Sequence, residues 1–159
     1  MIWKSPTQAQ TNKQRIIFLD IDGVLNTQHT LLNGDYIDGR LMQRLERLVK
    51  ESGANIVISS SWADEAKKLL SDYGFKYADK IIGVTPRVRR WRGEQILDWI
   101  EENGACDYVI LEDDPFDICG EIFDGINNEL VVHVDFRTGL SEEDIERAIS
   151  VLKWGVGKK

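Results

Sequence analysis

The chain has few of the side chains that build disulfide frameworks, zinc sites and histidine-based catalytic sites. Its 159 residues include two cysteines and two histidines. Cys106 and Cys119 lack the spacing of metal ligands, so we interpret them as reduced thiols of an intracellular protein. His29 and His133 are too few for a three-histidine zinc site and argue against a histidine-based triad, and neither is assigned a role.

Long apolar runs and an excess of positive charge are also missing. No stretch reaches the roughly 18 consecutive apolar residues of a membrane-spanning helix. Residues 1–14 lack the apolar core of a signal peptide. We therefore expect a cytoplasmic protein without membrane partners. Acidic side chains outnumber basic ones by 27 to 20, which gives a net charge of −7. This balance disfavours a protein that coats nucleic acid through bulk charge.

What is present is the composition of one globular domain. The chain length suits a single domain, since domains typically hold about 100–200 residues. Hydrophobic residues make up 42% and charged residues 30% of the chain, which argues against disorder. We expect a flexible tail over residues 1–14, a folded domain over 15–153 and a second tail over 154–159.

Short, branched apolar runs alternate with amphipathic segments along the domain. The expected strands cover residues 15–20, 55–59, 77–82, 108–111 and 130–134. The expected helices cover residues 39–52, 62–73 and 94–103, and a last helix begins after Ser141, where Asp144 completes a capping box. Such alternation predicts an α/β fold with a mostly parallel sheet covered by helices on both faces.

Acidic side chains collect after two of the expected strands. Ligands of such sheets bind beyond the carboxyl ends of the strands, so the residues that follow 15–20, 55–59 and 108–111 should share one crevice. Six acids fall near this edge: Asp20, Asp22, Glu112, Asp113, Asp114 and Asp117. Their mutual repulsion would be relieved by a hard cation with oxygen ligands, for which Mg²⁺ is the best candidate. A solvated acidic rim is the alternative.

The sequence IIFLDIDGVLN (16–26) resembles motif I of the haloacid dehalogenase-like (HAD) superfamily, a hydrophobic strand followed by Asp-x-Asp-Gly. Segments that match the other motifs follow in the same order: NIVISSSW (55–62), RWRGEQILDWI (90–100) and YVILEDD (108–114). Together with DFRTGLSEEDIERAISVL (135–152), they are similar to small capless phosphatase domains associated with RNA repair. The resemblance implies a Rossmann-like, three-layer α/β/α sandwich without a cap domain.

The resemblance also implies roles for three acids. Asp20 would be the nucleophile that forms an aspartyl-phosphate, and a carboxylate can split phosphoryl transfer into two easier steps. Asp22 would serve as general acid and then general base, and residues two apart on an extended chain face the same side. The implied Mg²⁺ ligands are Asp20, the backbone carbonyl of Asp22, and Asp113. The alternative for Asp-x-Asp-Gly is a turn held by Asx hydrogen bonds.

Three consecutive serines follow the second expected strand. Ser60 would hydrogen-bond the phosphoryl oxygens, because in similar members the hydroxyl lies two residues before the tryptophan. Ser59 is the alternative, and Ser61 would either contact the substrate or cap the next helix.

The segment 86–92 is rich in arginine and contains Trp91. Arg92 would be the catalytic cation, although the family more often has Lys there, and Arg89 and Arg90 compete for this role. Arginines next to an aromatic ring suit the phosphates and base of a nucleic-acid end. A solvated basic loop over packed tryptophans is the alternative.

The spacing of the motifs leaves no room for a cap domain. Asp22 and Ser60 are 38 positions apart, and Ser60 and Arg92 are 32 apart. We therefore expect an open site and a Mg²⁺-dependent phosphomonoester hydrolase acting on a large or projecting phosphorylated substrate. A nucleic-acid end or a nucleotide would fit such a site. A phosphotransferase and a non-catalytic module that binds phosphate or nucleic acid are the alternatives. Glu112, where the family more often has Asp, could reach the metal through water or orient Arg92.

Overall fold

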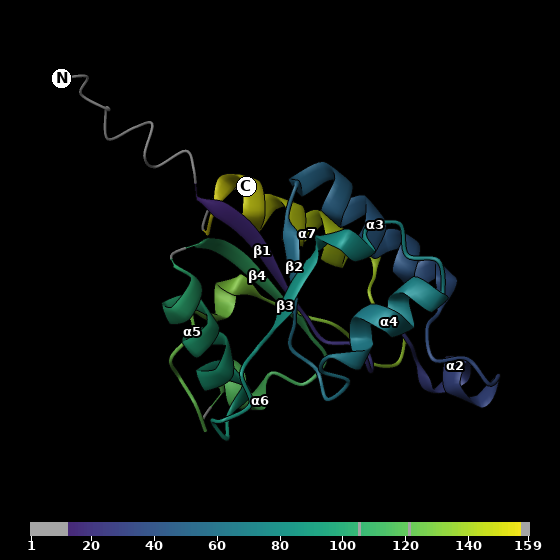
Figure 1. Ribbon diagram of the computed structural model, residues 1–159, viewed down its shortest axis with the longest axis horizontal. Coiled ribbons are helices and arrows are strands. Elements are labelled where there is room, and N and C mark those ends of the chain that lie inside the picture. Colours follow the sequence, from purple (N-terminus) through teal and green to yellow (C-terminus); the bar gives the residue numbers. More distant parts are fainter. Residues whose placement is uncertain (1–12, 105, 121, 157–159) are drawn as a thin grey trace.

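The computed structural model describes residues 13–104, 106–120 and 122–156 (Figure 1), so residues 1–12 and 157–159 of the two expected tails lie outside the described residues. Its strands are β1 (Gln14–Leu19), β2 (Asn55–Ile58), β3 (Ile81–Val84), β4 (Cys106–Glu112) and β5 (Val131–His133). They form one sheet in the order β3-β2-β1-β4-β5, and every neighbouring pair is parallel. The expected parallel sheet is confirmed, and β1, which carries motif I, is its central strand.

Helices cover both faces of this sheet (Figure 1), which confirms the three-layer architecture. The helices are α2 (Gln28–Leu32), α3 (Gly39–Ser52), α4 (Glu65–Asp72), α5 (Arg92–Asn103), α6 (Phe116–Cys119) and α7 (Glu142–Trp154). One face carries α3, α4 and α7, the other face carries α5 and α6, and the short α2 projects from the edge.

Alternate side chains of β1 enter two separate hydrophobic cores. Ile17 and Leu19 pack on the side of α3 and α7, whereas Ile16 and Phe18 pack on the side of α5. All four side chains are fully buried. A strand that is covered on both faces must be apolar throughout, which is why this segment is a continuous hydrophobic run. Burial of the run fixes the register of the central strand, and so the position of the residue that follows it.

Two elements begin later than the sequence predicts. Helix α4 begins at Glu65 rather than at residue 62, because Ala63 has a left-handed backbone (φ 49°) that no α-helix can contain. Strand β3 begins at Ile81 rather than at residue 77, because the chain first makes a 3₁₀ turn over Ala78–Lys80. The sequence pattern also missed α2 and α6, which are too short to show an apolar stripe.

No domain is inserted between the motifs. Residues 22–60 are all described and form only α2, α3 and β2, and residues 60–92 form only α4, a 3₁₀ turn and β3 before α5 begins. The carboxyl edge of the sheet is therefore not covered by a cap, as the motif spacing predicted. None of the helices in the described part of the chain is long and apolar enough to cross a membrane.

Candidate active site

The carboxyl ends of three adjacent strands bring the predicted site residues together. Asp20 follows β1, Ser59 follows β2 and Glu112 ends β4. The ladder of the sheet continues into these residues: the Ser59 amide donates to the Leu19 carbonyl at 2.8 Å, and the Asp20 amide donates to the Leu111 carbonyl at 3.1 Å. Backbone pairing therefore holds the Asp20 main chain rigidly at the centre of the edge.

Arg92 connects all three strand ends. Its Nη1 atom donates to the Ser59 carbonyl at 2.6 Å and to Glu112 Oε1 at 2.8 Å. The same nitrogen lies 3.6 Å from Asp20 Oδ1. Arg92 is the first residue of α5, and its amide donates to Asp117 Oδ2 at 3.1 Å, which fixes the start of the helix. The cation expected beside Asp20 is therefore present, and the residues that follow the three strands meet at one edge of the sheet.

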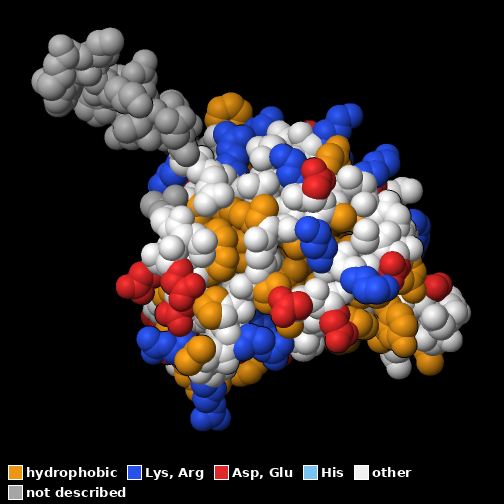
Figure 2. Space-filling model, viewed as in Figure 1, with side chains coloured by type: hydrophobic (Ala, Val, Ile, Leu, Met, Phe, Trp, Pro, Cys, Tyr) orange, Lys and Arg blue, Asp and Glu red, His pale blue; other side chains and the backbone are white. Residues whose placement is uncertain are grey.

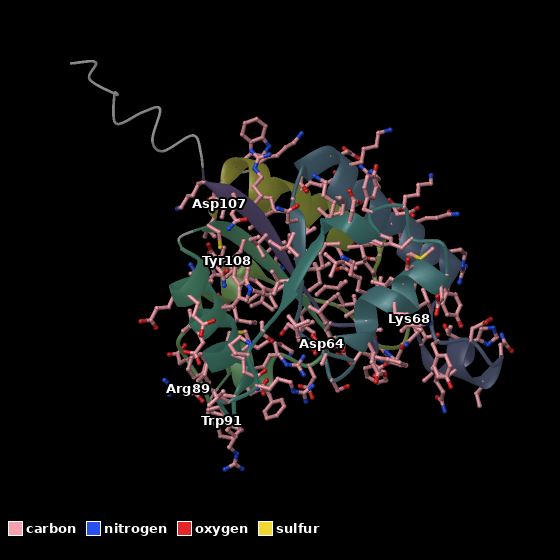
Figure 3. The ribbon with its side chains drawn as sticks, in the orientation of Figure 1. Asp64, Lys68, Arg89, Trp91, Asp107 and Tyr108 are labelled. Atoms are coloured by element: carbon pink, nitrogen blue, oxygen red, sulfur yellow. The ribbon has the colours of Figure 1, made fainter. Side chains whose placement is uncertain are left out.

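The competing arginines make other contacts. Arg89 forms ion pairs with Glu94 and Asp98 at 3.7 and 3.3 Å, and the guanidinium of Arg90 lies over the Trp91 ring at 4.6 Å. Figure 3 shows Arg89 and Trp91 together at one end of the molecule, away from Asp64 at the start of α4. Basic and acidic side chains alternate at this end of the surface (Figure 2).

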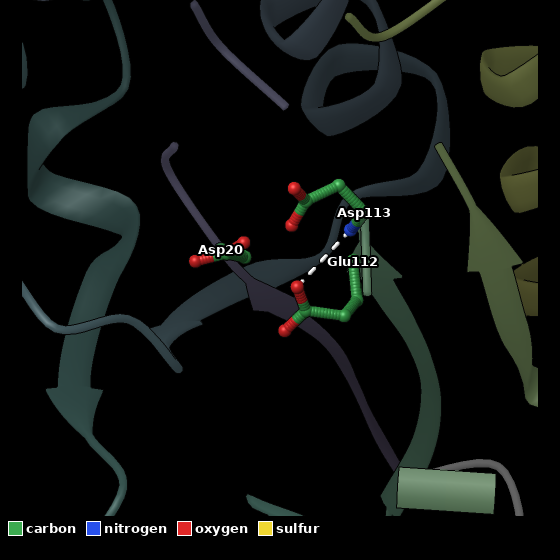
Figure 4. Close-up of side chains that lie close together, drawn as sticks. All are labelled: Asp20, Glu112 and Asp113. Carbon is green, nitrogen blue, oxygen red and sulfur yellow. Dashed lines mark hydrogen bonds between the residues drawn. The ribbon is translucent and has the colours of Figure 1, made fainter. Parts of the chain in front are cut away.

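One carboxylate oxygen from each of Asp20, Glu112 and Asp113 lies within 4.8 Å of the other two, which suits a metal site (Figure 4). Asp20 and Glu112 are 7% and 5% exposed. Glu112 Oε2 accepts the amides of Asp113 at 3.0 Å and Asp114 at 3.2 Å, while Oε1 accepts from Arg92. Of the roles considered for Glu112, the orientation of Arg92 is the one seen directly.

Burial destabilises the ionised forms of the carboxyl groups in this cluster. Desolvation raises the pKa of Asp20 from 3.8 to about 7. Desolvation, followed by the nearby Asp20 charge, raises the pKa of Glu112 well above its ordinary range, and the ion pair with Arg92 only partly opposes this rise. A divalent cation would offset the repulsion. The donor set consists of oxygen atoms, which fits a hard cation such as Mg²⁺.

The side chain of Asp22 lies outside the carboxylate cluster. It is exposed, and its Oδ1 accepts from Asn26 Nδ2 at 3.0 Å and from Trp62 Nε1 at 3.2 Å. The predicted ligand set placed only its backbone carbonyl on the metal. The carboxylate that joins Asp20 and Asp113 is instead Glu112.

The three serines at the end of β2 have different surroundings. Ser60 is buried, and its Oγ accepts from the Trp62 amide at 3.2 Å. Ser59 is also buried, and its Oγ has no hydrogen-bond partner among the described residues. Ser61 is exposed, and its carbonyl accepts from Arg87 at 3.4 Å. Two buried hydroxyls therefore lie beside the predicted nucleophile, and Ser61 lies at the rim.

Open clefts lie on two sides of the acidic residues. One, of about 430 Å³, is lined by Asp22 and residues 61–65. The other, of about 470 Å³, is lined by Asp113 and residues 133–137. A substrate could approach from either side, as an uncapped site allows.

Sequence reasoning missed two contacts of the site. Asn26 is 1% exposed and holds the Asp22 carboxylate, although nothing in its type or spacing marks it. His133 was assigned no role, yet its Nε2 lies 2.9 Å from the Asp113 carbonyl oxygen. Its position at the end of β5, next to β4, was the available signal.

The fold and the site together define a class of protein. The central strand β1 is followed by Asp-x-Asp, further acids lie at the end of its sheet neighbour β4, and Arg92 contacts both groups. This is the arrangement of a HAD-type hydrolase. The model of one family, described as the HAD domain in Swiss Army Knife RNA repair proteins, matches residues 16–145. The chain belongs to this family, and the resemblance inferred from its motifs is confirmed. No curated protein and no solved structure matches the chain.

Family membership indicates hydrolase chemistry of the phosphatase type, and HAD phosphatases generally use a divalent metal. The buried acids Asp20, Glu112 and Asp113 could bind one.

Proposed function

We propose that the protein is a Mg²⁺-dependent phosphomonoester hydrolase that works through an aspartyl-phosphate on Asp20. The observation that carries the proposal is the position of the Asp20 carboxylate, which lies close both to the Arg92 guanidinium and to the carboxylates of Glu112 and Asp113. Family membership supports the same reaction class.

In the first step Asp20 Oδ attacks phosphorus, the new O–P bond forms, and the ester P–O bond breaks. Asp22 gives a proton to the departing oxygen. In the second step Asp22 takes a proton from water, which attacks phosphorus and releases Asp20 and inorganic phosphate. Ser60 and Arg92 bind the phosphoryl oxygens and stabilise the charge that develops on them.

The metal would be held by Asp20 and Asp113, with the Asp22 backbone carbonyl as the further ligand that the family resemblance implies. Bound there, it would keep Asp20 ionised and neutralise charge on the phosphoryl group.

Replacement of Asp20 tests this mechanism. We expect Asp20→Asn to lower kcat for p-nitrophenyl phosphate by about 10³-fold or more, because the nucleophile is removed. Chelation of Mg²⁺ should abolish turnover of the wild type, and added Mg²⁺ should restore it. Asp72→Asn is the matched control, since Asp72 lies exposed on α4 and pairs only with Lys68 among the contacts seen. If Asp20→Asn hydrolysed the substrate at the wild-type rate, Asp20 would not be the nucleophile.

We also propose a phosphorylated nucleic-acid end as the substrate. Support comes from the open edge of the sheet, from the family description, and from exposed Arg90 and half-buried Trp91 near the start of α5. Ser61 at the rim is a further candidate contact, and Arg89 would have to exchange its ion pairs for phosphate contacts.

A substrate panel tests this assignment. RNA oligonucleotides with a 5′- or 3′-phosphate should be hydrolysed with higher kcat/KM than sugar phosphates or phosphopeptides. Their binding should weaken as salt rises, because phosphate contacts release counterions. Arg90→Ala should reduce both the affinity and the salt dependence, while Arg147→Ala, on α7, should change neither. Weak binding that ignores salt would contradict the assignment.

A further inference from the structure

We infer that Trp62 is a positioning residue, which holds the general acid Asp22 through its indole and the hydroxyl of Ser60 through its backbone. The inference rests on the proposed phosphatase function and adds to it a residue that acts through others.

The indole contact selects one oxygen of Asp22. Trp62 Nε1 and Asn26 Nδ2 both donate to Asp22 Oδ1, at 3.2 and 3.0 Å. With Oδ1 occupied by two donors, Oδ2 is the oxygen left to carry a proton to the leaving group. Asn26 is itself fixed, because it accepts from the Gly23 amide at 3.0 Å and donates to the Tyr36 carbonyl at 2.8 Å. The pair of donors therefore fixes the direction of the carboxyl group.

The backbone contact has a similar effect on Ser60. The Trp62 amide donates to Ser60 Oγ at 3.2 Å. The Ser60 hydroxyl has one proton to donate. Because its oxygen accepts the Trp62 amide on one side, the O–H is directed toward a different acceptor. At the site this acceptor would be a phosphoryl oxygen.

The turn that carries Trp62 is strained and braced. The Ala63 amide donates to the Ser60 carbonyl at 3.0 Å, and Ala63 has φ 49°, which a non-glycine residue rarely adopts. The Trp62 ring meets the Tyr36 ring edge-on, with 5.6 Å between centroids and 72° between planes. The Tyr36 amide in turn donates to the Tyr73 hydroxyl at 2.9 Å. Backbone strain that surrounding contacts maintain is a common feature of functional sites.

The leaving group provides the test. Trp62→Phe keeps an aromatic ring and the backbone amide but loses the indole N–H. A general acid matters most when the leaving group is a poor one. We expect kcat/KM to fall about 10-fold for an alkyl phosphate and less than about 2-fold for p-nitrophenyl phosphate. The 10-fold loss is smaller than the whole contribution of general acid catalysis, about 10²–10⁴-fold, because Asp22 itself remains. Trp154→Phe, at the exposed end of α7, is the matched control and should change neither. Equal losses with both substrates would overturn the inference.

A double-mutant cycle separates positioning from general support of the fold. In an Asp22→Ala background, Trp62→Phe should cause no further loss with the alkyl phosphate, because the group it positions is gone. Additive losses would show that Trp62 acts independently of Asp22.

A spectroscopic measurement covers the case in which Trp62→Phe folds poorly. The indole N–H resonance of Trp62 in an ¹⁵N spectrum should shift in Asp22→Ala, while the other four of the five tryptophans serve as internal references. An unchanged resonance would show that the hydrogen bond does not form. Failure of the proposed function would give a different result. Either the wild type would not hydrolyse phosphate esters, or Asp20→Asn would hydrolyse them at the wild-type rate.

Discussion

At the scale of single residues, two glycines share a backbone conformation but not an environment. Gly23 has φ +81° and Gly34 has φ +86°, in the left-handed region that side chains disfavour. A methyl group on Gly23 would collide with the carboxylate of Asp113, whereas a methyl group on Gly34 would meet nothing within 4 Å. The fourth residue of the Asp-x-Asp-Gly motif is therefore glycine for two reasons: the turn requires a left-handed backbone, and the candidate metal ligand Asp113 approaches closely.

The first prediction compares alanine at these two positions. Gly34→Ala should cost about 1 kcal/mol of unfolding free energy from backbone strain alone. Gly23→Ala should cost more, and it should also weaken Mg²⁺ binding, because Asp113 must move. Urea unfolding and calorimetric titration with Mg²⁺ measure the two effects. If the two variants lost the same unfolding free energy and bound Mg²⁺ equally well, the close approach of Gly23 to Asp113 would contribute to neither.

The sequence predicted the site residues that belong to motifs better than those that depend on long-range geometry. Asp20 was placed by the apolar strand before it, since that pattern is local. Arg92 could not be separated from Arg89 and Arg90, because its reach to Glu112 depends on how α5 packs against β4. Asn26 was missed because its partner Asp22 is brought near by a turn, and the sequence pattern does not specify that turn.

At the scale of elements, the start of α7 is a capping box that the sequence predicted and the structure confirms. Ser141 accepts from the Asp144 amide at 3.1 Å, and Asp144 Oδ2 accepts from the Ser141 amide at 2.9 Å. These bonds satisfy donors that the first turn of a helix leaves unpaired.

Loss of this cap should destabilise the protein without affecting catalysis. Ser141→Ala should lower the unfolding free energy by about 1 kcal/mol, with kcat unchanged. Ser71→Ala, an exposed position within α4, should change stability by only a few tenths of a kcal/mol. Thermal unfolding and steady-state kinetics on the same samples check both expectations. An altered kcat in Ser141→Ala would mean that α7 supports the site.

Among the elements, periodic segments were predicted well and irregular ones were not. The structure confirms the bounds of α3, because its apolar stripe and the terminating Gly53 are both local signals. The start of α4 was wrong, since the left-handed Ala63 is imposed by the contacts of the turn rather than by its residue type. The strand expected at 77–82 was wrong at its start, because a 3₁₀ turn occupies Ala78–Lys80 and the strand begins only at Ile81.

At the scale of the whole molecule, the buried acids link stability to pH. Since the pKa of Asp20 rises from 3.8 to about 7 on folding, the folded protein holds more protons than the unfolded chain between these values. Stability is therefore greatest below the unfolded pKa and is lost as pH rises toward the folded one. This sign is opposite to that of a carboxylate stabilised by a salt bridge.

We expect the unfolding free energy of the metal-free protein to fall between about pH 5 and 7, by up to about 1.4 kcal/mol per pH unit for each of Asp20 and Glu112, because both carboxyl groups have raised pKa values in the folded protein. Acids with lowered pKa values, such as Asp38 and Asp135, change protonation below this window. Asp20→Asn should reduce the slope and leave the part due to buried Glu112, and saturating Mg²⁺ should also reduce the slope. Chemical denaturation at a series of pH values measures it, and a flat profile for the metal-free wild type would contradict the raised pKa.

The direction of the sheet decides where anything attached to this domain would lie. The start of β1 and the end of α7 lie near one another (Figure 1), at the amino edge of the strands. The reacting groups occupy the opposite edge. A tag, a surface anchor or a fused protein joined next to the start of β1 or the end of α7 would therefore lie away from Asp20, which makes tethered forms of the protein practical reagents for activity assays.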